Sequence, residues 1–78
     1  MQEYPIYKTV QIAIEKNIAR VYLNRPDVHN AFNNDLINDL YDAFERLNNE
    51  NDVRVIILTG NGKSFCAGAD LNWLKSVV

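Results

Sequence analysis

Cysteine and histidine are almost absent from this chain, which has one of each among its 78 residues, Cys66 and His29. A single cysteine excludes an internal disulfide framework. One histidine and one cysteine are also too few for the ligand sets of typical zinc sites, which use about four side chains. The sequence therefore predicts neither disulfide cross-links nor a bound metal.

Long apolar runs are missing as well. No stretch approaches the ~18 apolar residues of a membrane-spanning helix. The first twenty residues contain charged side chains, among them Glu3, Lys8 and Glu15, and lack the apolar centre of a signal peptide. We therefore expect a soluble, cytoplasmic protein.

Charge of one sign is not concentrated anywhere in the chain. The formal net charge is −2, with no block of like charges, which predicts no binding to nucleic acid or to an anionic membrane. Hydrophobic residues make up 47% and charged residues 23%, a composition typical of globular proteins. A chain of 78 residues forms one small domain at most, with a marginal core.

Two segments near the N-terminus alternate between apolar and polar residues, the pattern of half-buried strands. They are residues 9–15 and 18–23, joined by Lys16 and Asn17, and we expect Asn17 to take the left-handed backbone angles of a tight turn. The sequence therefore predicts a β-hairpin. The side chains expected to point inward are Val10, Ile12, Ile14, Ala19, Val21 and Leu23.

A helix is predicted after residues 24–27, where Pro26 interrupts the strand pattern. Asn33 or Asn34 is a suitable N-cap, and Asp35 lies in the first turn, where the helix dipole favours a negative charge. The polar residues 48–52 end the helix. Its apolar stripe, at helical spacing, consists of Leu36, Ile37, Leu40, Ala43, Phe44 and Leu47.

A third strand is predicted over residues 53–58, where residues 55–58 are apolar without alternation. Such a run is typical of a strand covered on both faces, and so of a layered α/β fold. A loop follows over residues 60–69, and a last helix is expected to begin near Asp70, carrying Leu71, Trp73 and Leu74. The order is β-β-α-β-α. Because this last helix is barely begun at Val78, we expect the chain to be a piece of a longer one.

The glycine-rich residues 60–64 (GNGKS) do not match a nucleotide-binding motif. A P-loop would need a glycine at position 57, which is Ile57, and a dinucleotide fingerprint would need one at position 65, which is Phe65. A turn after a buried strand explains these glycines. Cys66 is expected to be a small packed residue rather than a nucleophile, because no base adjoins it in the sequence. His29 is expected to be a polar loop residue.

Residues 65–71 (FCAGADL) combine small residues with the expected start of a helix. Small residues let the backbone approach a ligand closely. Asp70 suits the cap, so the N–H of Ala69 would lie at a helix N-terminus, where developing negative charge is stabilised. Two interpretations are kept: a plain capped helix, and a donor to an anion or oxyanion.

The chain resembles the crotonase (enoyl-CoA hydratase/isomerase) superfamily in three segments that span nearly all of it. They are residues 24–32 (NRPDVHNAF), 55–60 (VIILTG) and 65–71 (FCAGADL). Residues 25–32 together with 69–73 (ADLNW) are most similar to the methylglutaconyl-CoA hydratase branch. The resemblance implies an α/β fold in which residues 1–78 form the opening turns of a β-β-α spiral, incomplete at the C-terminal end.

The resemblance also implies which residues bind and act. In that family the backbone N–H of the residue after an Ala-Gly pair donates to the thioester oxygen, a role that falls on Ala69. The neighbouring residues line the acyl-CoA site, which here are Ala67, Gly68, Asp70 and Leu71.

The loop after the second strand contacts the CoA moiety in this family, which implies Asp27 and His29. Relatives often carry a lysine where this chain has Asp27, so no charge contact from that position to a CoA phosphate is expected. Arg25 faces either such a phosphate or solvent, and both alternatives are kept.

The implied activity is that of a lyase that hydrates an enoyl-CoA, with methylglutaconyl-CoA of leucine degradation as the expected substrate. Acyl-CoA is the substrate, and no cofactor is implied. The second oxyanion donor and the acid/base glutamates would lie beyond Val78, so the chain alone is expected to be inactive. Related isomerases, hydrolases and dehalogenases are alternatives, as is a small non-enzymatic assembly module. The family's trimers, together with the apolar segments noted above, imply a homo-oligomer.

Overall fold

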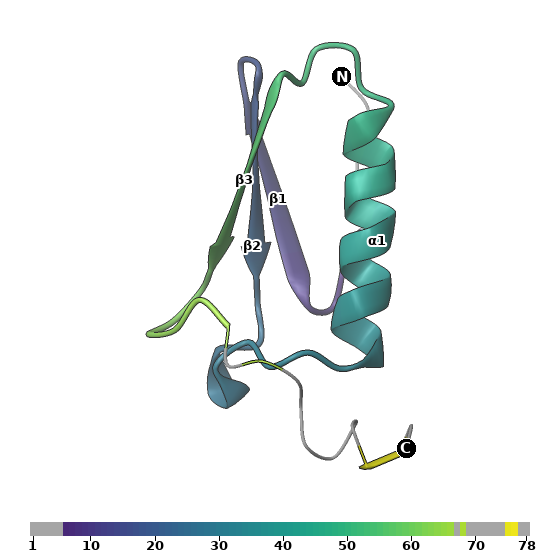
Figure 1. Ribbon diagram of the computed structural model, residues 1–78. Helices are drawn as coiled ribbons and strands as arrows, with labels where there is room; N and C mark the ends of the chain where they lie inside the picture. The colour runs from purple at the N-terminus through teal and green to yellow at the C-terminus, as the bar shows by residue number, and fades with distance from the viewer. Residues whose placement is uncertain (1–5, 67, 69–74, 77–78) are drawn as a thin grey trace.

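The computed structural model describes residues 6–66, 68, 75 and 76. Two strands come first, β1 (Val10–Glu15) and β2 (Ile18–Leu23), and are followed by the 3₁₀ turn η1 (Pro26–Val28), helix α1 (Asn34–Asn48) and strand β3 (Val55–Gly60). The three strands form one sheet, and α1 lies against one face of it (Figure 1). The α/β class is confirmed, and the position near Asp70 where the last helix is expected to begin lies outside the described residues.

The predicted hairpin is present. Strands β1 and β2 pair antiparallel with Glu15 opposite Ile18, which leaves Lys16 and Asn17 as a two-residue turn. The left-handed angle falls on Lys16, with φ 56°, and not on Asn17 as expected. The position in the turn therefore decides which residue takes the positive φ, against the side-chain preference.

Strand β3 joins the sheet beside β2 and runs parallel to it, so the strand order is β1-β2-β3. Parallel neighbours need a crossover connection, and α1 with its two loops provides it. The helix begins where the sequence predicts, because the side chain of Asn33 accepts a hydrogen bond from the N–H of Leu36 at 3.0 Å. It is also attached to the start of β1, where Thr9 donates to a carboxylate oxygen of Asp39 through its N–H (3.0 Å) and its hydroxyl (2.7 Å).

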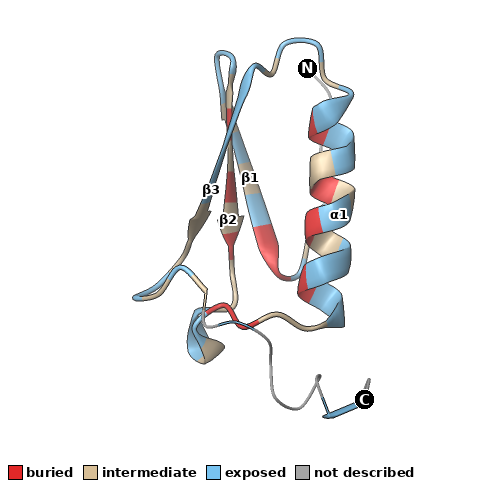
Figure 2. Ribbon diagram, viewed as in Figure 1, coloured by how far each residue is buried: buried red, intermediate tan, exposed pale blue. Residues whose placement is uncertain are grey.

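The core lies between α1 and the first two strands (Figure 2). The alternation of β2 is confirmed, since its three inward residues are fully buried. In the helical stripe, Phe44 is half-buried and Ile37 is exposed at the margin. The buried core residues are Val10, Ala19, Val21, Leu23, Leu36, Leu40, Ala43 and Leu47.

The expected burial of the third strand on both faces is wrong for this chain. Val55 is 50% exposed, and the next three residues, Ile56, Ile57 and Leu58, are 38%, 38% and 37% exposed. The reason is position: β3 is an edge strand, and the buried core is built from β1, β2 and α1. The apolar run is typical of a strand that is covered on both faces, and the described part of the chain covers it only in part.

Within the described ranges, no helix has both the length and the apolar character that crossing a bilayer requires.

Candidate functional site

Two loops meet where the parallel strands end. Leu23 and Gly60, the last residues of β2 and β3, lie opposite each other in the register. The first loop is residues 24–33, and the second follows β3, with residues 61–66 and 68 described. In open α/β sheets ligands bind outside the carboxyl ends of the strands, so this edge of the sheet is a candidate binding site.

The side chain of Asn30 connects the two loops. It is fully buried, at 0% exposure. Its Oδ1 accepts from the N–H of Arg25 at 2.8 Å, within the first loop. Its Nδ2 donates across to the carbonyl oxygens of Asn61 (2.9 Å) and Ser64 (2.8 Å) in the second loop.

Two further hydrogen bonds bring the end of the second loop against the first. The thiol of Cys66 donates to the backbone oxygen of Asn30, with Sγ 3.2 Å away. The N–H of Phe32 donates to the carbonyl oxygen of Gly68 at 2.7 Å. Cys66 is half-buried and packs against the core, as expected of a small packed residue. Gly68 is exposed and has φ 96°, a conformation that glycine adopts readily.

The structure puts the predicted CoA contacts in two places. Arg25 and Asp27 both line a polar hollow of about 270 Å³ that also includes Lys8, Asn33 and Asp35. Lys8 in this hollow forms an exposed ion pair with Asp35 at 3.2 Å. The guanidinium of Arg25 donates to the carbonyl oxygen of Ala31, so it supports its own loop, a role that neither alternative for Arg25 included.

His29 is exposed and faces the second loop. It takes left-handed backbone angles at the end of η1, with φ 55°. Its Nδ1 lies 3.1 Å from Oγ of Ser64. It is not among the residues that line the polar hollow.

Of the predicted acyl-CoA residues, Gly68 is described. The other four, Ala67, Ala69, Asp70 and Leu71, lie outside the described residues. Asn30, whose side chain joins the two loops, was not among the site residues expected from the sequence. Its place in the loop expected between the strand and the helix was a usable signal, because asparagine is among the residues that take positive φ, and here φ is 58°.

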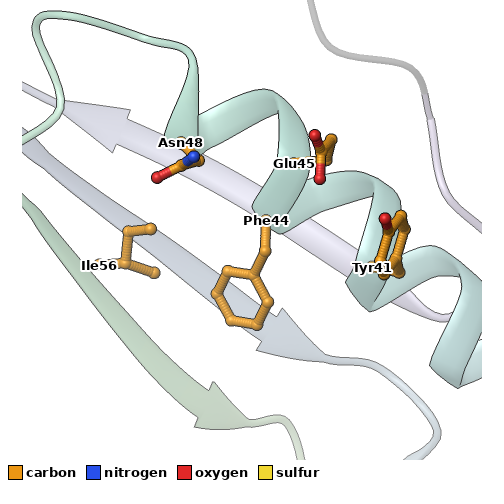
Figure 3. Close-up of a pocket in the computed structure, with 5 residues that line it drawn as sticks. All are labelled: Tyr41, Phe44, Glu45, Asn48 and Ile56. Carbon is orange, nitrogen blue, oxygen red and sulfur yellow. The ribbon is translucent and has the colours of Figure 1, made fainter.

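A second hollow, of about 400 Å³, lies away from these loops, between α1 and β3 (Figure 3). Phe44 and Ile56 face it from the helix and from the strand, with Tyr41, Glu45 and Asn48 along its helical side. The titratable groups that line it are the carboxylate of Glu45 and the phenol of Tyr41. This hollow lies where α1 does not cover the edge of the sheet.

The described residues include no group of three or more histidine, cysteine, aspartate or glutamate side chains that could hold a metal.

A cluster of three titratable side chains, Tyr7, Asp42 and Arg46, joins the segment before β1 to α1. Burial raises the pKa of Tyr7 to about 12, with a further contribution from its hydrogen bond to Asp42. The same hydrogen bond, followed by that from Arg46, lowers the pKa of Asp42.

Comparison with known proteins gives consistent matches. Residues 13–76 match the family described as enoyl-CoA hydratase/isomerase. A probable enoyl-CoA hydratase of Mycobacterium tuberculosis is 38% identical over 72 residues, covering 92% of this chain and 28% of that protein. A crotonyl-CoA hydratase of Syntrophomonas wolfei is 36% identical over 72 residues, covering 91% and 28%.

Solved structures agree with the sequence matches. The crystal structure of an enoyl-CoA hydratase from Shewanella pealeana superimposes with a TM-score of 0.83 at 32% identity. The match covers 87% of this chain and 26% of that one. The elements β1 to β3 with α1 thus have the arrangement found in crotonase-type folds, and the chain spans about 28% of the length of the curated relatives it matches.

Proposed function

Because this chain belongs to the enoyl-CoA hydratase/isomerase family, we propose that it forms the N-terminal part of an enzyme that adds water to an enoyl-CoA thioester. The match over residues 13–76 carries this proposal. In it, residues 1–78 are the opening part of one crotonase-like domain, and a parent chain supplies the rest.

The proposed chemistry uses a backbone donor in the second loop. Addition of water to an enoyl thioester passes through an enolate-like oxyanion on the thioester oxygen. The N–H of Ala69 is proposed to donate to that oxygen, with Ala67, Gly68, Asp70 and Leu71 lining the acyl-CoA site. The second donor and the acid/base carboxylates are proposed to lie beyond Val78. Water addition forms one C–O bond and one C–H bond with no net oxidation or reduction, so the proposal includes acyl-CoA as substrate and no cofactor.

The first loop is proposed to contact the CoA moiety. The polar hollow that Arg25 and Asp27 line, at the carboxyl end of the strands, supports this role for them. His29, which faces Ser64 of the second loop, is also proposed to contact CoA. Lys8 adds a cation to the same hollow.

The acyl group is proposed to be 3-methylglutaconyl, on the likeness of residues 25–32 and 69–73 to that branch of the family. The test of this substrate assignment compares kcat/KM for 3-methylglutaconyl-CoA with kcat/KM for crotonyl-CoA in the parent enzyme. A higher value for the branched substrate is expected. A clear preference for crotonyl-CoA would contradict the substrate assignment and leave the hydratase assignment intact.

The test of the proposed donor is Ala69→Pro in the parent enzyme. Proline lacks the N–H, and it is tolerated near the first turn of a helix, where that N–H has no intrahelical partner. The interaction strengthens as charge develops on the thioester, so kcat is expected to fall by about 10²–10³-fold while KM changes little. Hydration is followed by the loss of enoyl absorbance.

Ala69→Gly retains the amide and is the matched control, expected to lose far less activity than Ala69→Pro. Circular dichroism establishes that both variants are folded. A folded Ala69→Pro enzyme that turns over within a few-fold of the parent would show that another group is the donor. The 78-residue chain by itself is proposed to be inactive in the same assay.

A homo-oligomeric assembly is also proposed. The exposed apolar side chains of the edge strand β3 support it, since uncovered apolar edges pair readily with other copies.

A further inference from the structure

We propose that Asn30 is a positioning residue, which sets the direction of the peptide N–H that follows Gly68. The inference rests on the proposed function, in which that N–H belongs to Ala69 and donates to the thioester oxygen. Asn30 does not reach the reacting atoms itself in this proposal. It acts by attaching the second loop to the first.

The hydrogen bonds of Asn30 require an amide side chain. The oxygen accepts one hydrogen bond from the first loop, and the NH₂ group donates two to the second. An aspartate carboxylate can only accept, and an aliphatic side chain of this size can do neither. Because the side chain is fully buried, water does not replace a lost partner easily.

The effect of Asn30 reaches Gly68 through two backbone groups. The oxygen of Asn30 accepts from the thiol of Cys66, two residues before Gly68. The N–H of Phe32, two residues after Asn30, donates to the carbonyl oxygen of Gly68 at 2.7 Å. The first loop therefore contacts the second at Asn61, Ser64, Cys66 and Gly68.

Peptide geometry links the Gly68 carbonyl to the next N–H. In a planar trans peptide the C=O and the N–H point in opposite directions. The hydrogen bond that holds the carbonyl of Gly68 therefore also sets the direction of the N–H in the same peptide unit. A donor fixed in advance stabilises a developing oxyanion without reorganising, and a displacement of about 1 Å costs on the order of 10²-fold in rate.

Two substitutions separate this role from general stability. Asn30→Asp keeps the acceptor for the Arg25 N–H, removes both donors, and places a carboxylate oxygen against the carbonyls of Asn61 and Ser64. Asn30→Gly removes the side chain without adding charge, and glycine accepts the φ of 58° without strain. If Asn30→Asp does not fold, the same measurements on Asn30→Gly decide the question.

The first measurement needs no activity and uses the 78-residue chain. Amide hydrogen exchange, followed by NMR, reports whether the Phe32 N–H keeps its bond to Gly68. We expect exchange at Phe32 to be about tenfold faster in the Asn30 variants, with the amides of β2 and α1 still protected. Asn51→Asp is the matched control, the same change in an exposed turn, and is expected to leave Phe32 unchanged. Parent-like exchange at Phe32 in folded Asn30 variants would overturn the proposal.

The second measurement is made on the parent enzyme. Asn30→Asp is expected to lower kcat by about 10²-fold with little change in KM, because the substrate still binds and the donor is misdirected. If Ala69→Pro lowers kcat and folded Asn30→Asp does not, the positioning role is overturned and the proposed function stands. If Phe32 exchange accelerates while Ala69→Pro leaves kcat unchanged, the attachment by Asn30 is supported and the donor assignment alone fails.

Discussion

At the scale of single residues, Gly60 and Gly62 let the two loops come together. A Cβ on Gly60 would lie 2.6 Å from the carbonyl oxygen of Phe65 and 2.8 Å from Nδ2 of Asn30. A Cβ on Gly62 would lie 2.8 Å from Cβ of Pro26, at a backbone φ of 87°. All three distances are below van der Waals contact, so the contact between the loops requires glycine at both positions.

Gly60→Ala is expected to destabilise the chain by about 1–3 kcal/mol, because backbone atoms of Phe65 must move to admit the methyl group. Urea unfolding of the 78-residue chain measures the change. Ala13→Val adds carbon at an exposed strand position and is expected to change stability by no more than about 0.5 kcal/mol. Equal stability of Gly60→Ala and the parent would mean that the loops separate more easily than the structure indicates.

At the scale of elements, Asn33 sets where α1 begins, and hydrogen bonds from the segment around β1 attach the helix to the sheet. Asn33 caps the helix, Thr9 bonds to Asp39, and Tyr7 donates to a carboxylate oxygen of Asp42 at 2.5 Å. Arg46, one turn further along, bonds to the same carboxylate oxygen at 2.9 Å. These polar contacts set the helix against the sheet beside the apolar core.

Asn33→Ala is expected to cost about 1 kcal/mol of stability, because the N–H of Leu36 loses its side-chain acceptor. The same substitution at Asn38, exposed inside the helix, serves as the control. Alanine is the better helix former there, so Asn38→Ala is expected to be neutral or to stabilise by a few tenths of a kcal/mol. Thermal unfolding of both variants checks the opposite signs; a loss of stability shared by both would contradict the capping role.

The raised pKa of Tyr7 predicts that the stability of the folded chain falls at alkaline pH. Its pKa of about 12 in the folded chain exceeds the ordinary value of 10, so folding favours the protonated phenol. That contribution is complete below pH 10 and is lost as the pH rises toward 12. Tyr7→Phe removes it, and the stability difference between parent and variant is expected to shrink across this range. The measurement is urea unfolding at several pH values; a difference that stays constant would contradict the raised pKa.

At the scale of the whole molecule, β3 has apolar side chains that the rest of the described chain leaves partly exposed. The register pairs Ile57 with Arg20 and pairs Ile56 and Leu58 with the buried Ala19 and Val21. Residues paired across a sheet share a face. Ile56 and Leu58 therefore lie on the same face of the sheet as α1, which covers them only in part, and Ile57 lies on the opposite face. Both faces of β3 are apolar and partly open.

The 78-residue chain is therefore expected to self-associate in a concentration-dependent way, measured by sedimentation velocity. Ile57→Lys introduces a charge on the open face of the edge strand, a substitution that opposes edge-to-edge pairing, and is expected to shift the chain toward monomer. Asn38→Lys adds the same charge on the exposed surface of α1 and is the control. A compact monomer held across a wide concentration range, without any substitution, would contradict this prediction.

The sequence by itself determined the hairpin, the bounds of α1 and the position of β3 to within two residues. The alternation of residues 9–15 and 18–23 and the stripe from Leu36 to Leu47 are repeats within a short window, and burial on one face follows directly from such repeats. The cap at Asn33 is local in the same way. The family resemblance was also available from the sequence, because its segments depend on residue identity and order.

Only the tertiary structure decided what surrounds each element. The apolar run at residues 55–58 is the same whether a strand is central or at an edge, so its exposure depended on where α1 packs. The turn geometry, and not the residue type, gave Lys16 the positive φ. The bonds of Asn30 to Asn61 and Ser64 cross 31 and 34 residues of sequence. Partners so distant are brought together by the parallel pairing of β2 with β3, which no local pattern in the first loop contains.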